Sequence, residues 1–315
     1  MRKGALVIFC FFSSFNCYPQ QLAQYTQYMF NQYGLNPAVG GSKSCPEAKM
    51  GYRTQWLGFD DAPITEFFSI NGVLPNKRRL NSRDKHAIGL YIEGDQTGPT
   101  SRTGIYVSYS YHKPITRNLY GSVGLFAGAM QYAFNANQTL VAIPDPVVAS
   151  SRAAWLYPDL NPGVFIYGER LYAGLSVKNV VGNSLTKIYG KQNHLTRHFY
   201  LSAGYKLSTS SRDYSHIPSF NLKFSPYGTP SLDLNYMVDY RNRIAFGLSY
   251  RHFDAACALV RIGISKFISL GYSFDYTLSK IRYASSNSHE IIIAVRICKN
   301  GDSDGNKHTE CPAYQ

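Results

Sequence analysis

The sequence predicts an all-β protein: a transmembrane, antiparallel, up-and-down β-barrel of about 14 strands with a short N-terminal plug-like segment. Apolar residues alternate with small polar residues in one segment after another, so each segment has one apolar and one polar face. These segments approach the length that crosses a bilayer as a tilted strand. The composition agrees, because 26 Tyr, 18 Phe and 26 Gly accompany only 16% charged residues.

The stretch from Cys257 to Lys280 displays this pattern most clearly. Its even positions are apolar or aromatic, as at Ile262 and Tyr272, and its odd positions are mostly small or polar, as at Gly263 and Ser273. The run is too long for one ordinary soluble strand of about 5–6 residues. It therefore predicts two membrane-length strands joined by a tight turn near Lys266.

The same alternation recurs along the chain and predicts an even number of strands, as closure of a bacterial barrel requires. A soluble sandwich also alternates, but no second layer is evident to cover so many apolar faces, which favours lipid as their environment. The expected strands lie near residues 49–56, 64–73, 88–93, 104–111, 122–129, 161–167, 171–177, 201–207, 220–224, 231–239, 244–250, 258–264, 268–278 and 290–297.

The pattern divides the chain into four parts. A basic start and a short apolar run predict a signal peptide over residues 1–17. Residues 18–48 do not alternate and are expected to form a periplasmic or plug segment, with a short helix near Gln21–Phe30 as one option. Residues 49–298 form the predicted outer-membrane barrel, and residues 299–315 form a polar tail that is expected to be flexible.

The connections predict an orientation. If the N-terminus of the barrel lies in the periplasm, the two longest connections, near Asn135–Leu160 and Val181–Thr196, face outward. The turns near Gly168, Arg241 and Lys266 then face the periplasm and are short, which is the usual asymmetry of such barrels; the connection Asn76–Lys85 is the exception on that side.

The charge balance favours a membrane surface or an acidic partner over nucleic acid. The formal net charge is +13, yet the basic residues are scattered and their densest cluster is only Lys77-Arg78-Arg79. Cysteines are too few for a disulfide scaffold; Cys298 and Cys311 are one candidate pair, and free thiols are the alternative.

Charged residues that share the polar face of the strands are expected to face the lumen. Both signs occur, which favours interior ion pairs over the alternative, a polar conduction path. The candidate lumen residues are Arg53, Glu93, Lys206, Asp233, Asp239, Arg261, Asp275, Glu290 and Arg296.

The connection after the first strand is the candidate partner-contact loop, although a rigid turn is an equal alternative. Its candidate contact residues are Trp56, Phe59, Asp60 and Asp61. The sequence contains no recognisable nucleophile elbow, zinc helix or phosphate-binding glycine loop, so we expect no catalytic residue, metal or cofactor.

Several motifs, in order along the chain, resemble those of the PorP/SprF family. Tyr52–Pro63 is similar to its Tyr-Arg-x-Gln-Trp-x-Gly-Phe-x-x-Ala-Pro element, and other matches lie at Gln24–Asn31, Leu35–Ala38, Asp95–Thr100, Phe274–Ser279 and Ser288–Ile291.

This resemblance implies a non-enzymatic outer-membrane barrel of Bacteroidetes, associated with type IX secretion and gliding motility. Its implied partners are outer-membrane lipid, components of the secretion machinery and large secreted adhesin-type cargo. A porin or substrate-specific channel is the main alternative function, and an outer-membrane hydrolase is a distant third.

Overall fold

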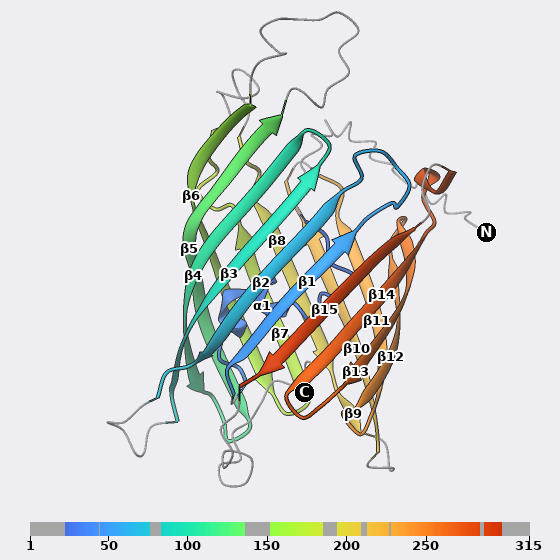
Figure 1. The fold of residues 1–315 in the computed structure, drawn as a ribbon. Helices are drawn as coiled ribbons and strands as arrows, with labels where there is room; N and C mark the ends of the chain where they lie inside the picture. Colours follow the sequence, from blue (N-terminus) through green and yellow to red (C-terminus); the bar gives the residue numbers. More distant parts are fainter. Residues whose placement is uncertain are drawn as a thin grey trace, which may run out of the picture.

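A computed structural model describes residues 23–43, 45–75, 83–135, 152–184, 194–208, 213–226, 228–283 and 287–297. The strands form one tilted wall around a central lumen (Figure 1). They are β1 (Glu47–Thr54), β2 (Ile64–Val73), β3 (Lys85–Thr97), β4 (Thr100–Pro114), β5 (Leu119–Asn135), β6 (Arg152–Gly168), β7 (Leu171–Lys178), β8 (His198–Tyr205), β9 (Leu207–Ser208), β10 (Tyr214–Phe224), β11 (Ser231–Tyr240), β12 (Ile244–Arg251), β13 (Ala255–Gly263), β14 (Ile268–Thr277) and β15 (Ser288–Arg296).

The wall closes by antiparallel pairing of its first and last strands. β1 pairs with β15 over its whole length, from Glu47 opposite Arg296 to Thr54 opposite His289. β8 and the two-residue β9 both pair with β10, so together they occupy one position in the wall. The result is a closed 14-strand barrel, which confirms the predicted fold class.

The strand expected at residues 161–167 is longer than predicted. β6 runs from Arg152 to Gly168 and pairs along its full length with β5. Pro158 and Pro162 weaken the local strand pattern, because proline has no amide hydrogen for the ladder. Pairing with the regular β5 nevertheless keeps β6 in a strand conformation at both prolines.

Alternation along each strand separates an outer face from an inner face. In β12, Phe246 and Leu248 are exposed, whereas Ala245, Ser249 and Arg251 between and beyond them are buried. The outer faces of the other strands likewise carry exposed Val, Ile, Leu and Tyr side chains. Such an apolar outer band around a polar interior is the arrangement that a bilayer requires. No helix in the described part of the chain is long and apolar enough to span a membrane.

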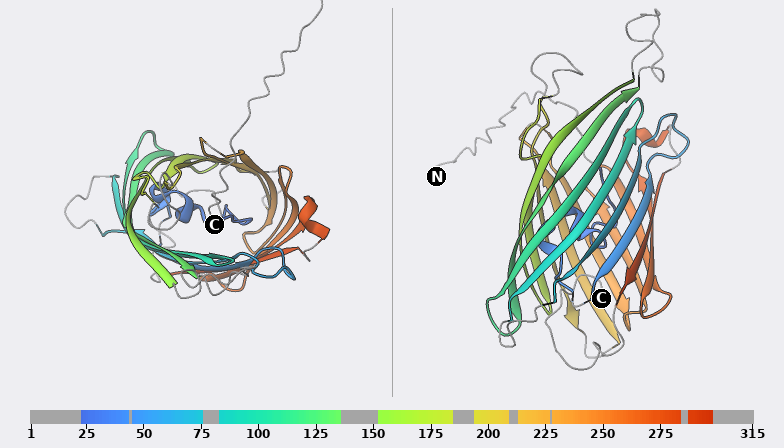
Figure 2. Two further views of the ribbon diagram at one scale, coloured as in Figure 1. Left: turned by 90° about the horizontal axis from the view of Figure 1, so that it is seen from above. Right: turned by 60° about the vertical axis from the view of Figure 1, so that its left-hand side comes forward.

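The N-terminal segment lies inside the barrel. Viewed along the barrel axis, residues 23–43 and 45–46 sit within the ring of strands (Figure 2), and we call this segment the plug. It contains a four-residue helix α1 (Gln32–Leu35) and a 3-10 turn η1 (Pro37–Val39). The helix considered for Gln21–Phe30 is wrong for its described residues: they form an extended start and a turn, in which the Thr26 and Gln27 amides bind a wall carboxylate.

Two barrel ends can be distinguished by the connections that they carry. The terminal end holds the start of β1, the end of β15 and the short turns around Glu169, Asn242 and Ser265. The loop end holds the connections 55–63, 136–151 and 179–197, and the 3-10 turn η3 (Lys280–Tyr283). The predicted signal peptide (1–17) and tail (299–315) lie outside the described residues.

Two cysteines fall in the described part of the chain. Cys257 is a buried free thiol on the inner face of β13, and Cys45 is disulfide-bonded. The Cys298–Cys311 pair considered from the sequence lies outside the described residues.

A charge on the outer face should destabilise the barrel according to its depth. Leu248→Arg, at the middle of β12 where the side chain is 71% exposed, should cost about 2–4 kcal/mol of folding free energy in lipid vesicles. The matched control Phe253→Arg, 79% exposed in a loop-end turn, should cost about 0–1 kcal/mol. Denaturant titration followed by tryptophan fluorescence measures both, and equal costs would contradict a membrane-embedded outer face.

Candidate functional site: the plug and its charged anchor

The start of the plug is held by a buried group of charges centred on Thr26. Its hydroxyl donates to Asp275 at 2.5 Å, and its backbone amide donates to Glu290 at 2.7 Å. Arg53 donates to the same hydroxyl at 2.7 Å and pairs with Asp275 at 2.7 Å and Glu290 at 3.2 Å. All four side chains are buried. We call Thr26, Arg53, Asp275 and Glu290, together with Arg251, the charged anchor.

Arg251 extends this group around the wall. It donates to Thr26 Oγ1 at 3.0 Å and pairs with Asp233 at 2.8 Å, Asp254 at 3.2 Å and Asp275 at 3.4 Å. The anchor therefore ties the plug to β1, β12, β14 and β15, with Asp233 reaching it from β11. Buried charges of this kind need complete pairing, because a lone buried charge is strongly destabilising.

Small hydroxyl side chains of the wall hold the rest of the plug. Ser176 donates to the Leu35 carbonyl at 2.6 Å, Ser122 to the Ala38 carbonyl at 2.7 Å and Ser110 to the Gly40 carbonyl at 2.6 Å. His112 also donates to the Gly40 carbonyl, at 2.6 Å. These wall donors replace the water that the three plug carbonyls would otherwise bind.

Glycines of the wall allow the plug backbone to approach closely. A Cβ atom added at Gly124 would lie 2.5 Å from the Ala38 amide nitrogen, and one at Gly163 would lie 2.0 Å from Asn36 Oδ1. Asn36 also donates from Nδ2 to the Val164 carbonyl at 2.9 Å. The small residues on the polar face thus create the space into which the plug fits.

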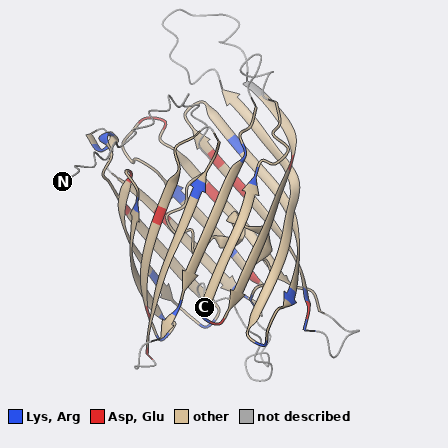
Figure 3. Ribbon diagram, turned by 180° about the vertical axis from the view of Figure 1, so that it is seen from behind, with Lys and Arg blue, Asp and Glu red and all other residues tan. Residues whose placement is uncertain are grey.

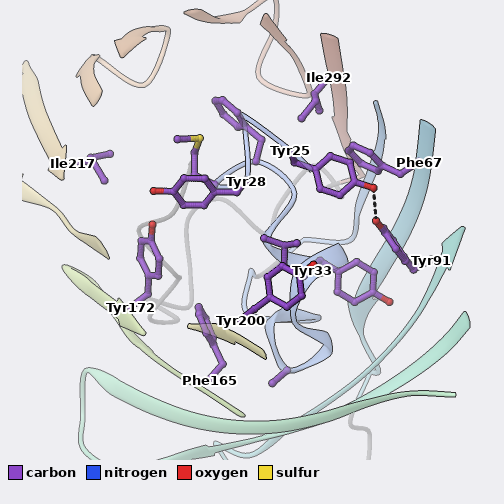
Figure 4. Close-up of a cluster of buried hydrophobic side chains, with 14 of the residues drawn as sticks. Tyr25, Tyr28, Tyr33, Phe67, Tyr91, Phe165, Tyr172, Tyr200, Ile217 and Ile292 are labelled. Carbon is purple, nitrogen blue, oxygen red and sulfur yellow. Dashed lines mark hydrogen bonds between the residues drawn. The ribbon is translucent and has the colours of Figure 1, made fainter. Parts of the chain in front are cut away.

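An aromatic core fills the space between plug and wall (Figure 4). Tyr25 packs edge-on against Phe67 with ring centroids 5.5 Å apart, and its hydroxyl lies 3.2 Å from that of Tyr91. Tyr28 and Tyr33 also carry hydrogen-bonded hydroxyls, on Ser219 at 2.8 Å and Ser108 at 2.6 Å. Buried aromatic side chains supply apolar area, while their hydroxyls satisfy the polar wall.

Burial shifts the titration of plug side chains. It raises the pKa of Tyr25, Tyr28 and Tyr33 above the ordinary value, so these phenols stay neutral and can donate hydrogen bonds. Burial also lowers the pKa of Lys43 to about 8, although Glu47 at 2.8 Å opposes that shift. Arg296 at the end of β15 adds to the lowering.

The sequence-derived lumen residues fall into several places in the structure. Arg53, Asp275 and Glu290 meet in the charged anchor, and Asp233 joins them through Arg251. Arg261 pairs with Asp239 nearer the terminal end, and Glu93 pairs with Lys178 at 3.0 Å. Figure 3 shows charged positions of both signs in the wall, including at mid-height. Lys206 and Arg296 are half-buried and belong to none of these three ion-pair groups.

The candidate loop residues follow β1 at the loop end. Trp56 has a φ of 51°, and its amide donates to Ser288 at 3.0 Å; Asp61 has a φ of 58°, and its carbonyl accepts from the Gly98 amide at 3.1 Å. Phe59, Asp60 and Asp61 are exposed. The loop is therefore tied to its neighbours while its tip stays accessible, and partner contact through it remains a prediction.

Sequence reasoning missed Arg251 and Thr26. Arg251 continues the inner parity of Ala245, Gly247 and Ser249, but it stands at the very end of its strand, where the pattern stops. Thr26 lies in a segment without periodicity. Among the residues that the structure describes, no group of three His, Cys, Asp or Glu side chains is arranged to hold a metal ion. The arrangement holds a segment in place through ion pairs and hydrogen bonds.

Removing one partner of the anchor should destabilise the protein strongly. Arg53→Ala leaves Asp275 and Glu290 buried with reduced compensation, and we expect a loss of about 3–5 kcal/mol in denaturant titration. The control Arg241→Ala removes a comparable pair, Arg241–Asp213 at 2.9 Å, at an exposed site, where salt and solvent weaken it. Similar losses for the two variants would contradict the anchoring role.

Removing the plug should open an ion path through the lumen. A variant lacking residues 23–42 should give larger single-channel conductance in planar bilayers than the full chain, because the wall donors would then bind water. Heat-modifiable gel migration checks that the shortened variant still forms a barrel. Equal conductance from two folded proteins would contradict the idea that the plug obstructs the lumen.

Comparisons with known proteins address both the fold and the family. Among solved structures, the chain is similar to the toluene transporter TbuX of Ralstonia pickettii, with a TM-score of 0.51 and 11% identity over 86% of this chain and 93% of that one. It is also similar to a FadL homologue of Pseudomonas aeruginosa, with a TM-score of 0.47 and 9% identity over 85% and 92% of the two chains. At these identities, the TbuX likeness supports the fold alone.

A search of curated proteins finds no match. The family described as type IX secretion system membrane protein PorP/SprF matches residues 18–295, which include the plug and nearly the whole barrel. This chain therefore belongs to the PorP/SprF family of type IX secretion system membrane proteins.

Proposed function

We propose that this protein is a non-enzymatic outer-membrane barrel that assists the export or surface anchoring of particular large secreted proteins, such as gliding adhesins. Membership of a type IX secretion family supports the assignment of this protein to that secretion system. The observation that carries the accessory role is the plug, which fills the lumen with a buried aromatic core and is fixed at Thr26 by ion-paired side chains.

The plug argues against a diffusion porin as the main activity. A porin needs a continuous water-filled path, whereas here Ser110, Ser122 and Ser176 are committed to plug carbonyls. Those contacts would all have to break before a solute could use the same surface. A barrel with its interior occupied can still offer its two ends and its outer wall to protein partners.

We propose that the terminal end faces the periplasm and the loop end faces outward. Short turns such as Glu169–Arg170 at the terminal end and the long connections 136–151 and 179–197 at the loop end support this orientation. The exposed tip at Phe59, Asp60 and Asp61 then becomes an outward contact for cargo, and the terminal end becomes available to secretion components in the periplasm.

Deleting the gene should remove one or a few large proteins from the cell surface while leaving most of the surface proteome unchanged. Quantitative mass spectrometry of surface-labelled proteins measures this loss, and a plasmid copy of the wild-type gene should restore it. A Phe59→Ala/Asp60→Ala/Asp61→Ala variant should restore it only partly. Normal secretion combined with altered uptake of small solutes would instead establish the channel alternative.

A further inference from the structure

The terminal end contains a basic pocket that the plug does not use. A pocket of about 740 Å³ lies between the β11–β12 turn, the β13–β14 hairpin and the end of β15. Its basic lining residues are Arg241, Arg243, Arg261, Lys266 and Arg296, and no acidic residue is found among the described residues that line it. The remaining lining is mainly small polar and apolar hairpin residues such as Gly263, Ser265 and Phe267.

Only part of this positive charge is neutralised by described residues. Asp239 pairs with Arg261, and Asp213 pairs with Arg241. Arg243, Lys266 and Arg296 have no ion pair within the described ranges. An excess of three positive charges in one concave site attracts anions.

The spacing of these charges favours an extended ligand. Arg243 precedes β12 and Arg296 ends β15, and the strands β12, β13, β14 and β15 are consecutive neighbours in the wall. Three strand spacings separate them, or about 14 Å. Successive carboxylates along a peptide can contact charges distributed over that span, whereas one phosphate or carboxylate group meets only the charges whose side chains converge on it.

The inner parity of the site disfavours a lipid headgroup. Arg261 is buried on the inner face of β13, and Arg296 shares its parity with the buried residues Ile292 and Ala294 of β15. The chain's own tail is a weak competitor, because the side chains of residues 299–315 include two Lys and three Asp or Glu, a net charge of only −1.

We propose that this pocket, the basic rim, binds an acidic polypeptide segment of a partner protein at the periplasmic mouth of the barrel. This inference rests on the proposed function for its orientation and for the identification of the partner with the secretion machinery. Arg243, Lys266 and Arg296 provide the attraction, and the paired Arg261 and Arg241 border the site. Such an interaction is steered electrostatically and weakens with salt.

Binding of a fluorescein-labelled polyglutamate peptide to the full chain in detergent tests the site. At low ionic strength, Arg243→Glu/Arg296→Glu should weaken binding by about tenfold or more, because attraction becomes repulsion. The matched control Lys280→Glu/Arg282→Glu changes the net charge equally at the loop end and should bind like the wild type. Fluorescence anisotropy measures affinity, and heat-modifiable migration confirms that each variant is folded.

Four outcomes would overturn the assignment. Equal affinity for the wild type and the rim variant would mean that the peptide does not bind at the rim. Equal weakening in the control would mean that the peptide responds to overall charge alone. Displacement by inorganic phosphate at matched ionic strength would mean a single-oxyanion site. A gain of about tenfold or more after deleting residues 299–315 would mean that the chain's own tail occupies the rim.

A cellular measurement separates this inference from the proposed function. The rim variant should reach the outer membrane at wild-type levels but should reduce the surface amount of the same cargo that gene deletion removes. If peptide binding is lost while cargo export is normal, the rim has no part in export and the proposed function still stands. If gene deletion leaves all cargo in place, the proposed function fails whatever the peptide assay gives.

Discussion

The structure depends on satisfying the backbone and charges that lie inside a closed barrel. At the charged anchor, Thr26 provides one hydroxyl that bonds with Arg53, Arg251 and Asp275 together, so a single plug residue joins side chains from three strands. Each of these charges would be costly to bury alone. Plug and wall therefore require each other, because the plug supplies hydrogen-bonding groups that a lumen filled only by wall side chains would lack.

The two faces of each strand contact two different environments. The outer face meets lipid through side chains such as Phe246 and Leu248, and only its apolar character matters there. The inner face must instead match one particular partner. Ser110, Ser122 and Gly163 stand where a plug carbonyl needs a donor or where Asn36 needs space. The small polar residues on this face are therefore binding residues for a segment of the same chain.

The sequence predicted the barrel well because strand alternation is a local signal with a period of two residues. It also placed Arg53, Asp275 and Glu290 on the inner face by parity alone. It could not bring them together, because their meeting depends on the β1–β15 and β14–β15 registers. The role of Thr26 could not be predicted for a related reason. Its role comes from tertiary contacts of an irregular segment, and such a segment has no period to detect.

The charges that stay unpaired among the described residues of the terminal end need a separate explanation. Inside the barrel, basic and acidic side chains form ion pairs around Thr26 and at Glu93–Lys178, so these charges already stabilise the fold. At the terminal end, Arg243, Lys266 and Arg296 contribute to no such group among the described residues, yet they line one pocket. Unneutralised like charges repel one another and lower stability. Placing these three residues together is physically reasonable if an acidic partner neutralises them when it binds. A rim with only a structural role would be more stable with an additional carboxylate.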